Sequence, residues 1–421
     1  MHCCCEWHGS PTISIWPRER LNDDAPLLLD VTRLIWRRWK GRLPTGIDRV
    51  CLAYLRHFGP RAQAVVQRDG FRRIFDTKAS RELFDLLEAP ADAFKSSLIA
   101  GSLRNLGRFD DSGRGRPYLN VGHTGLNSPG FRRWVRTAGV QPIYMVHDLI
   151  PITHPEFCRE GEPAKHRDRM RTVLTTACGV IGNSRVTLDE LAMFARNEKL
   201  PSPPAIAAWL GSEPLRPPTS GTEPERPTFV TLGTIEARKN HRMLLDIWSR
   251  LIDRLGAAAP RLLIIGQRGW EAEDVFELLD RSDRLRGHVI ELSHCSDEEL
   301  ATHLATARAL LFPSHSEGYG LPLVEALGMG VPAIASDLPV MRELGGDVPL
   351  YLDPLDSRAW EAAIMDYADA NSAAREEQLR RMKSFRLPDW DSHFAAVERC
   401  LGDLSGTAEA DKHRLDQRLH G

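Results

Sequence analysis

Short apolar runs alternate with helical patterns along nearly the whole chain, and this alternation constrains the fold more than any other feature. A strand that is followed by a helix, and then by another strand, is typical of a parallel sheet. We expect strands at 26–31, 117–121, 142–146, 179–182, 205–210, 228–232, 261–265, 289–292, 309–312, 331–335 and 350–352. We expect helices at 46–57, 128–137, 164–176, 186–196, 240–255, 274–279, 297–307, 321–327, 340–344 and 358–370. The sequence therefore predicts an α/β protein with helices on both faces of its sheets.

A proline-rich stretch predicts where the chain divides. Residues 211–227 contain five prolines together with Ser, Thr and Glu, which is typical of an interdomain linker. We expect a first domain at 1–210. After the linker the alternation restarts and forms one complete doubly wound domain at 228–385. An amphipathic stretch at 392–401 predicts a further helix near the C-terminus.

The charge of the chain is unevenly distributed. Residues 1–210 hold 31 Lys and Arg against 22 Asp and Glu, a charge of +9, whereas the rest holds 24 against 35, a charge of −11. A basic face on the first half would favour an anionic membrane surface or a lipid-diphosphate acceptor. Scattered, solvated arginines are the alternative interpretation.

The cysteines and the apolar runs indicate a cytoplasmic protein. Five of the eight cysteines are isolated, and no pair has metal-binding spacing, as expected of reduced thiols. Cys3, Cys4 and Cys5 leave metal binding, acylation and a frayed terminus open. The N-terminus does not read as a signal peptide. No apolar run approaches the roughly 18–20 residues of a spanning helix, so any contact with an anionic inner membrane would be peripheral.

Two cations precede the long helix expected at 240–255. The segment from Gly233 to His241 reads Gly-Thr-Ile-Glu-Ala-Arg-Lys-Asn-His. Positive charges just before a helix N-terminus are unfavourable, because that end of the helix dipole is itself positive. The placement of Arg238 and Lys239 becomes favourable if an anion binds there, since both side chains would then bind phosphate oxygens. Asn240 is a suitable N-cap. The segment is a candidate anion site, and a solvated loop with chance basic residues is the alternative.

Two acids bracket a glycine turn later in the same half. The stretch from Glu317 to Glu325 reads Glu-Gly-Tyr-Gly-Leu-Pro-Leu-Val-Glu. Its glycines let backbone N–H groups approach a ligand, and Pro322 begins a helix whose N-terminus would face that ligand. Acids that accept hydroxyl hydrogen bonds beside a helix end that faces a diphosphate suit a sugar nucleotide. Two helix-flanking acids without a ligand are the alternative.

Both segments resemble one known family. Glu317 through Ala326 matches the E-x7-E pattern (EGxGLPxxEA) of retaining GT-B glycosyltransferases of family four, and residues 233–240 match its G-T-x-x-x-R-K-N segment. The resemblance implies two Rossmann-like doubly wound domains with a cleft between them. It also implies that a last helix, at about 386–421, returns to the N-terminal domain.

The resemblance further implies residue roles. Arg238 and Lys239 would bind the diphosphate, Glu317 would contact the transferred sugar, and Glu325 would bind the ribose hydroxyls. The implied catalytic residues are His147, Arg238, Lys239 and Glu317. The implied donor-binding residues are Gly46, Gly233, Arg238, Lys239, Glu317, Gly318, Tyr319, Gly320, Leu321 and Glu325.

The N-terminal half contributes candidates for the acceptor side. His147 and Asp148 follow an expected strand, at the sheet edge where ligands bind in open α/β sheets. A structural histidine is the alternative, but the resemblance implies that His147 lies near the sugar and the acceptor. Asp148 would orient the imidazole or cap the next turn. Arg49 and His123 are further acceptor-side candidates, with an ordinary helix entry as the alternative for the segment around Gly46 and Arg49.

Other motifs are absent or misplaced. The chain has no G-x-x-x-x-G-K-[ST] phosphate loop and no G-x-S-x-G elbow. Asp389-Trp390-Asp391 has the D-x-D form of metal-dependent enzymes but stands in the tail, where helix capping is the better interpretation. The basic, aromatic run from Trp36 to Lys40 is isolated, so we expect no nucleic-acid partner.

The resemblance therefore implies a retaining hexosyltransferase that needs no metal or other cofactor. Its donor would be a nucleoside-diphosphate sugar, with mannose the first candidate, and its acceptor a glycan or a lipid-linked glycan of a surface polysaccharide. A GT-B sugar-nucleotide epimerase and a catalytically silent sugar-nucleotide-binding protein are the alternatives.

Overall fold

The computed structural model describes residues 26–41, 45–68, 70–89, 94–104, 107–110, 112–213, 215 and 224–419, without the side chains of 102–104 and 405–419. The expectations for Cys3, Cys4 and Cys5, and for most of the 211–227 linker, fall outside these residues. Within the described ranges, every helix is too short or too polar to span a bilayer.

The first sheet, in the N-terminal domain, has seven strands in the order β3-β2-β1-β4-β5-β6-β7. The strands are β1 (Leu27–Asp30), β2 (Ala62–Arg68), β3 (Phe71–Ile74), β4 (Pro117–Asn120), β5 (Gln141–Val146), β6 (Gly179–Gly182) and β7 (Ala205–Ala207). All neighbours pair in parallel except β2 and β3. The helices are α1 (Thr32–Trp39), α2 (Gly46–Phe58), α3 (Thr77–Glu88), α4 (Phe94–Arg104), α5 (Phe131–Ala138), α6 (Ile150–Thr153), α7 (Glu162–Thr176) and α8 (Arg185–Glu198).

The second sheet, in the C-terminal domain, has six parallel strands in the order β10-β9-β8-β11-β12-β13. The strands are β8 (Thr228–Leu232), β9 (Arg261–Ile265), β10 (Val289–Leu292), β11 (Ala309–Phe312), β12 (Ala333–Ser336) and β13 (Leu350–Leu352). The helices are α9 (His241–Leu255), α10 (Glu273–Arg281), α11 (Asp297–Ala305), α12 (Leu321–Gly328), α13 (Pro339–Gly345), α14 (Ser357–Ala368) and α15 (Ala373–Met382).

Each sheet reverses its strand order at one point, and that point positions the candidate site. The order reverses between β8 and β11 in the second sheet and between β1 and β4 in the first. In open α/β sheets, ligands bind outside the carboxyl ends of the strands beside such a reversal. Gly233 directly follows β8, and Pro313 directly follows β11, so the two candidate donor segments begin at this place. On the first sheet, His123 lies three residues after β4 and His147 directly after β5.

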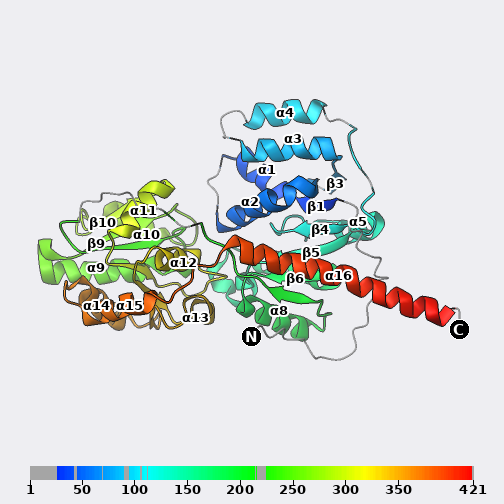
Figure 1. Cartoon of the computed structure of the whole chain (residues 1–421). Coiled ribbons are helices and arrows are strands. Elements are labelled where there is room, and N and C mark those ends of the chain that lie inside the picture. The colour runs from blue at the N-terminus through cyan, green and yellow to red at the C-terminus, as the bar shows by residue number, and fades with distance from the viewer. Residues whose placement is uncertain are drawn as a thin grey trace.

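The last helix, α16 (Trp390–Leu419), runs back across the N-terminal domain (Figure 1). His393 on this helix contacts the Tyr54 hydroxyl of α2 through Nε2 at 2.9 Å, and the Phe394 ring stacks on His57 with 3.9 Å between centroids. Asp389 accepts a hydrogen bond from the Ser392 N–H at 2.6 Å, so this acid caps the start of α16, as the sequence indicated. The chain therefore passes between the domains twice, once before β8 and once before α16.

Several expected elements differ from the structure. The sequence reasoning missed β2, β3, α1, α3, α4, α6 and α15. The strand expected at 205–210 ends at Ala207, because the chain then leaves the sheet and the Leu210 carbonyl accepts the Tyr319 hydroxyl. The strand expected at 331–335 begins two residues late, because the Val331 N–H bonds back to the Ala326 carbonyl at 2.9 Å and closes the end of α12.

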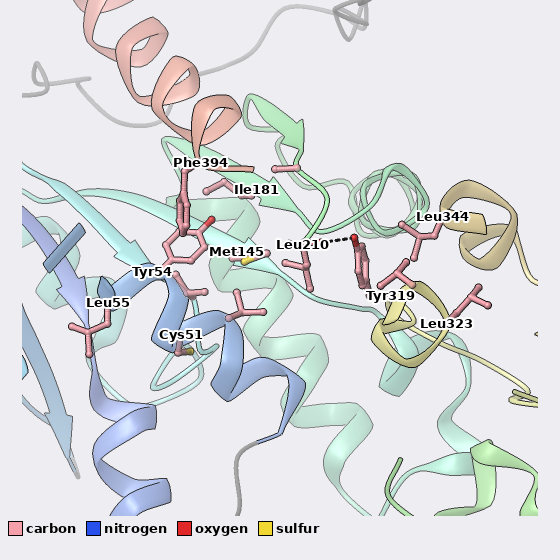
Figure 2. Close-up of a cluster of buried hydrophobic side chains, with 14 of the residues drawn as sticks. Cys51, Tyr54, Leu55, Met145, Ile181, Leu210, Tyr319, Leu323, Leu344 and Phe394 are labelled. Carbon is pink, nitrogen blue, oxygen red and sulfur yellow. Dashed lines mark hydrogen bonds between the residues drawn. The ribbon is translucent and has the colours of Figure 1, made fainter. Parts of the chain in front are cut away.

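One apolar cluster continues from one domain into the other. It includes Tyr54, Met145 and Ile181 of the N-terminal domain and Leu323 and Leu344 of the C-terminal domain (Figure 2). Burial of apolar surface stabilises an interface by roughly 25 cal/mol per Å². The domains are therefore packed against each other rather than merely tethered.

Candidate functional site

Both candidate cations bond to one carboxylate. Glu317 follows β11 and accepts from Arg238 Nη1 at 2.9 Å and from the Lys239 ammonium. Arg238 Nη1 also donates to the Ser316 carbonyl at 2.8 Å, and Lys239 Nζ lies 4.9 Å from the centre of the Phe312 ring. Arg238 and Lys239 form a short 3₁₀ turn, Ala237–Lys239, that brings them to the edge of the sheet. The structure thus brings the two donor segments into contact.

Glu236 is a member of this cluster that the sequence reasoning missed. Its Oε1 lies 2.7 Å from Arg238 Nε, and its side chain is 4% exposed. Arg238 is therefore held between two carboxylates, a geometry that fixes the plane of its guanidinium group. The signal was present in the sequence, since Glu236 stands in the same segment as the two cations. We name the set Glu236, Arg238, Lys239 and Glu317 the charged cluster.

Burial and pairing set the charges within the charged cluster. Burial alone would raise the pKa of Glu317, but Arg238 and Lys239 lower it to about 2. Burial lowers the pKa of Lys239, and the Glu317 carboxylate opposes that effect. Burial raises the pKa of Glu236 against the charge of Arg238. Glu317 is therefore a stable anion and a poor nucleophile, because two ion pairs stabilise its carboxylate and lower its basicity.

Asn240 does not cap α9 as the sequence suggested. It occupies the N-cap position with φ 58°, but its side chain makes no cap hydrogen bond. The Nδ2 group instead donates to the carbonyls of Pro313 at 3.2 Å and Pro354 at 2.9 Å. Asn240 therefore ties the cation segment to the loop that follows β11, and it leaves the start of α9 uncapped by this side chain.

Gly318 brings the charged cluster against His147 and Asp148 of the other domain. A Cβ atom at Gly318 would lie 2.6 Å from the His147 carbonyl oxygen and 2.7 Å from Asp148 Cβ, closer than real contacts allow. The negative charge of Asp148 also contributes to the raised pKa of Arg238. Gly233 (φ 131°) and Gly320 (φ 124°) both have backbone conformations that favour glycine. The candidate residues of the two domains thus meet at Gly318.

His147 is neutral and has a defined tautomer. Its Nε2 lies 2.7 Å from the Val121 carbonyl oxygen, which can only accept, so Nε2 carries the proton and Nδ1 carries the lone pair. Burial lowers the pKa of His147 to about 4, so the ring is uncharged at neutral pH. Asp148 accepts from the Ile150 N–H at 3.2 Å and therefore caps the turn that follows.

His123 packs beside His147, and His166 packs against the ring of His123. The His123 ring lies 5.1 Å from the His147 ring and 5.9 Å from the His166 ring. His123 Nε2 donates to the Met145 carbonyl at 2.7 Å, and His166 Nε2 donates to the Asp148 carbonyl at 3.1 Å. Burial lowers the pKa of both rings. The sequence reasoning missed His166, which lies in α7 and meets the others only through the fold.

Glu325 bonds to a residue of the opposite domain. This acid of α12 has a side chain that is 5% exposed, and Arg49 Nη1 of α2 lies 2.6 Å from its Oε1. Gly46 of α2 packs against Leu321 of α12, since a Cβ atom at Gly46 would lie 3.2 Å from Leu321 Cδ1. Arg49, expected on the acceptor side, thus lies at the donor-side carboxylate.

Tyr319, one of the expected donor-binding residues, has its side chain in the apolar cluster between the domains. Its hydroxyl donates to the Leu210 carbonyl at 2.9 Å, and the ring is buried in the apolar cluster between the domains (Figure 2). Burial raises the pKa of the Tyr319 hydroxyl. Tyr319 therefore contributes to the packing between the two domains, because its ring is buried among apolar side chains.

Glu343 of α13 joins the two domains at another point. Its carboxylate accepts from the Arg185 N–H at 2.8 Å, the Val186 N–H at 3.0 Å and Trp209 Nε1 at 2.7 Å. Arg185 and Val186 open α8, so a carboxylate of the C-terminal domain caps a helix of the N-terminal domain. The sequence could not indicate this role, because Glu343 lies more than 130 residues from its partners along the chain.

Among the residues that the structure describes, no three or more His, Cys, Asp or Glu side chains gather in an arrangement that could hold a metal ion.

Comparisons with known proteins give the class. Residues 215–382 match the family model described as glycosyl transferases group 1. Serotype-specific mannosyltransferase WbdA of Escherichia coli is 29% identical over 278 residues, covering 58% of this chain and 32% of WbdA. O-antigen chain mannosyltransferase B of Escherichia coli is 34% identical over 161 residues, covering 38% of this chain and 42% of that protein. The chain thus spans less than half the length of these relatives.

Solved structures give the fold. Anabaena HepE, in complex with UDP and glucose, is 15% identical with a TM-score of 0.62, covering 89% of this chain and 99% of HepE. Sucrose-phosphate synthase from Thermosynechococcus elongatus is 15% identical with a TM-score of 0.59, covering 91% of this chain and 100% of that one. The chain therefore has the GT-B fold of glycosyltransferases. The match of residues 215–382 to the glycosyl transferases group 1 model agrees with the glycosyltransferase resemblance drawn from the sequence.

Proposed function

We propose that the protein transfers a hexosyl unit, with mannose the first candidate, from a nucleoside-diphosphate sugar to a glycan or a lipid-linked glycan of a surface polysaccharide. The observation that carries this proposal is the charged cluster, which meets His147 and Asp148 across the domain boundary at Gly318. The mannosyltransferase names of the relatives support the choice of mannose. The UDP and glucose in the HepE complex support a sugar nucleotide as the donor.

In this proposal the charged cluster binds the leaving diphosphate. Negative charge grows on the diphosphate as the bond to the sugar breaks, and preorganised cations in a water-poor site stabilise such charge strongly. Arg238 is held in a fixed orientation by Glu236, and Lys239 by Glu317. These contacts exist before the donor arrives, so the cations need little rearrangement during the reaction.

His147 and Glu317 hold the sugar in this account. His147 Nδ1 accepts a hydrogen bond from a sugar hydroxyl, because Nε2 is committed to the Val121 carbonyl. A carboxylate has about four lone-pair sites, so Glu317 can accept a sugar hydroxyl in addition to its two cations. Closure of the cleft would exclude water from the activated sugar.

We propose retention of the anomeric configuration without a covalent sugar–enzyme intermediate. The low pKa of Glu317, at about 2, and its two ion pairs make it a weak nucleophile. A phosphate oxygen of the leaving group would then accept the proton of the acceptor hydroxyl on the same face of the sugar. We also propose that the two cations replace a divalent ion at the diphosphate, so EDTA should leave transfer intact.

A transfer assay tests the proposal. The purified protein is incubated with GDP-mannose or UDP-glucose and a mannose-containing glycolipid acceptor, with and without EDTA, and the linkage of the product is read by NMR. We expect an acceptor-dependent product with the α configuration of the donor, formed equally in EDTA. Conversion of the donor without any acceptor would instead support the epimerase alternative. Binding of both donors without product under any condition would favour a silent binding protein.

A further inference from the structure

The ion pair between Arg49 and Glu325 joins a buried carboxylate of one domain to an arginine of the other. Arg49 lies on α2 and its side chain is 46% exposed, whereas the Glu325 side chain on α12 is 5% exposed. An exposed pair is worth little, but a buried carboxylate depends strongly on its partner. Arg49 is therefore more than a surface contact, because the charge of Glu325 depends on it.

The groups that face Glu325 act in opposite directions. Burial raises the pKa of Glu325, and Asp297 of α11 raises it further, whereas Arg49 lowers it. Without Arg49, only burial and the negative charge of Asp297 would act on the pKa of the Glu325 carboxylate, and both raise it. Glu325 would then take up a proton at a higher pH than in the intact protein.

The start of α2 is built to hold Arg49 in place. Thr45 and Asp48 form a capping box in which the Thr45 N–H donates to Asp48 Oδ2 at 2.7 Å. Asp48 is itself bonded by Arg33 Nε at 2.7 Å and by Arg37 Nε at 2.9 Å. A capped helix end does not fray easily, so the first turn of α2, which carries Arg49, is held in place by the N-terminal domain.

A hollow between the domains opens beside this ion pair. It has a volume of about 400 Å³ and is lined by Arg49 and Ala53 of α2, by Asp297 of α11 and by Leu321 of α12. Small-molecule pockets usually measure about 300–1,000 Å³, so a nucleoside can fit there. Arg49 therefore lines this hollow and at the same time pairs with the Glu325 carboxylate.

We propose that Arg49 is a positioning residue of the donor site, which keeps the Glu325 carboxylate charged and oriented for the hydroxyls of the donor ribose. This inference rests on the proposed function and deepens it. Arg49 reaches Glu325 from the opposite domain, so recognition of the ribose is completed only when the domains are closed. Binding of the nucleotide and closure of the cleft are therefore coupled through one ion pair.

Nucleotide binding by matched variants tests this role. GDP and 2′,3′-dideoxy-GDP are titrated into the wild type, Arg49→Ala, Arg49→Lys and the control Arg254→Ala, which removes an exposed arginine of α9 that does not line the hollow. A hydrogen bond to a charged group contributes about 1.5–3 kcal/mol, so we expect Arg49→Ala to weaken GDP binding about tenfold or more. Its affinity for the dideoxy nucleotide should change much less. Arg49→Lys should restore part of the preference, and Arg254→Ala should match the wild type.

A pH series separates positioning from a structural role. In Arg49→Ala, GDP affinity should begin to fall at a higher pH than in the wild type, because Glu325 then protonates more readily. Circular dichroism confirms that each variant is folded. If folded Arg49→Ala keeps the wild-type preference for GDP over the dideoxy nucleotide and the wild-type pH profile, the inference is wrong. Tighter GDP binding by Arg49→Ala also overturns it, because Arg49 would then block the site.

The outcome for the wild type keeps the two proposals distinct. A wild type that binds neither GDP nor UDP, with or without an attached sugar, overturns the proposed function and this inference with it. A wild type that binds GDP and prefers it to the dideoxy form, with an Arg49→Ala variant that behaves identically, overturns the role of Arg49 alone.

Discussion

Glu317 and Glu325 lie eight residues apart in one loop and helix, yet their carboxylates have opposite surroundings. Glu317 bonds to two cations of its own domain, whereas Glu325 bonds to one arginine of the other domain. Pairing lowers the pKa of Glu317, and burial raises the pKa of Glu325. One half of the candidate donor site is thus complete within the C-terminal domain, and the other half depends on the closed arrangement.

Removal of the two carboxylates should have unequal effects on stability. Glu317→Ala leaves two buried cations without their shared partner, so it should lower the free energy of unfolding by about 3–5 kcal/mol. Glu325→Ala removes a buried acid and leaves Arg49 in a half-exposed position, so it should cost much less. Urea denaturation of both variants measures the difference. Equal losses would contradict the distinction between the two acids.

Loss of a cation should act mainly on the reaction. In Lys239→Ala the leaving diphosphate loses a preorganised partner, so kcat should fall by roughly 10²–10³, equivalent to about 2.7–4 kcal/mol. Lys383→Ala removes a lysine that follows α15 and should leave kcat unchanged. Steady-state rates with saturating donor provide the measurement, and equal rates in the two variants would remove the charged cluster from the mechanism.

The two acids should also respond to pH with opposite signs. The folded pKa of Glu317, at about 2, lies below the ordinary value of about 4.3, so its contribution to stability is complete above pH 4.3 and is lost as the pH falls towards 2. Glu325 has a raised folded pKa, so its contribution becomes more favourable as the pH falls. As the pH falls from 7 to 3, the urea midpoint of the wild type should therefore fall relative to that of Glu317→Gln and rise relative to that of Glu325→Gln.

The carboxylate of Glu343 should have a smaller effect. Glu343→Ala removes the acceptor of two N–H groups at the start of α8 and of the Trp209 indole, and a lost cap costs about 0.5–2 kcal/mol. Glu376→Ala, at an exposed position in the first turn of α15, is the matched control. Differential scanning calorimetry compares the two, and an unchanged transition in Glu343→Ala would exclude a contribution of this contact to domain packing.

The sequence predicted the C-terminal domain better than the N-terminal one, for a physical reason. Strands such as β9 and β11 are buried in the middle of a parallel sheet and read as unbroken apolar runs, so their bounds were predicted correctly. β2 contains two glutamines and β3 contains two arginines, and β3 lies at the sheet edge in the antiparallel direction. Neither strand carries the apolar pattern on which the prediction depended.

The same limit applies to the candidate site. Arg238, Lys239 and Glu317 stand in contiguous motifs, so sequence alone could point to them, and the structure brings them together. His166 and Glu343 have partners far along the chain, and only the tertiary fold creates their contacts. Tyr319 lies inside a motif but packs between the domains, which shows that membership of a motif does not fix the direction of a side chain.

The most direct test of the account is acceptor-dependent release of nucleoside diphosphate from GDP-mannose, measured for the wild type and for Lys239→Ala. The account predicts release by the wild type only when the glycan acceptor is present, and a rate at least 100-fold lower in the folded Lys239→Ala variant. Equal release by the two proteins would contradict the central claim that the charged cluster binds the leaving diphosphate of a sugar nucleotide.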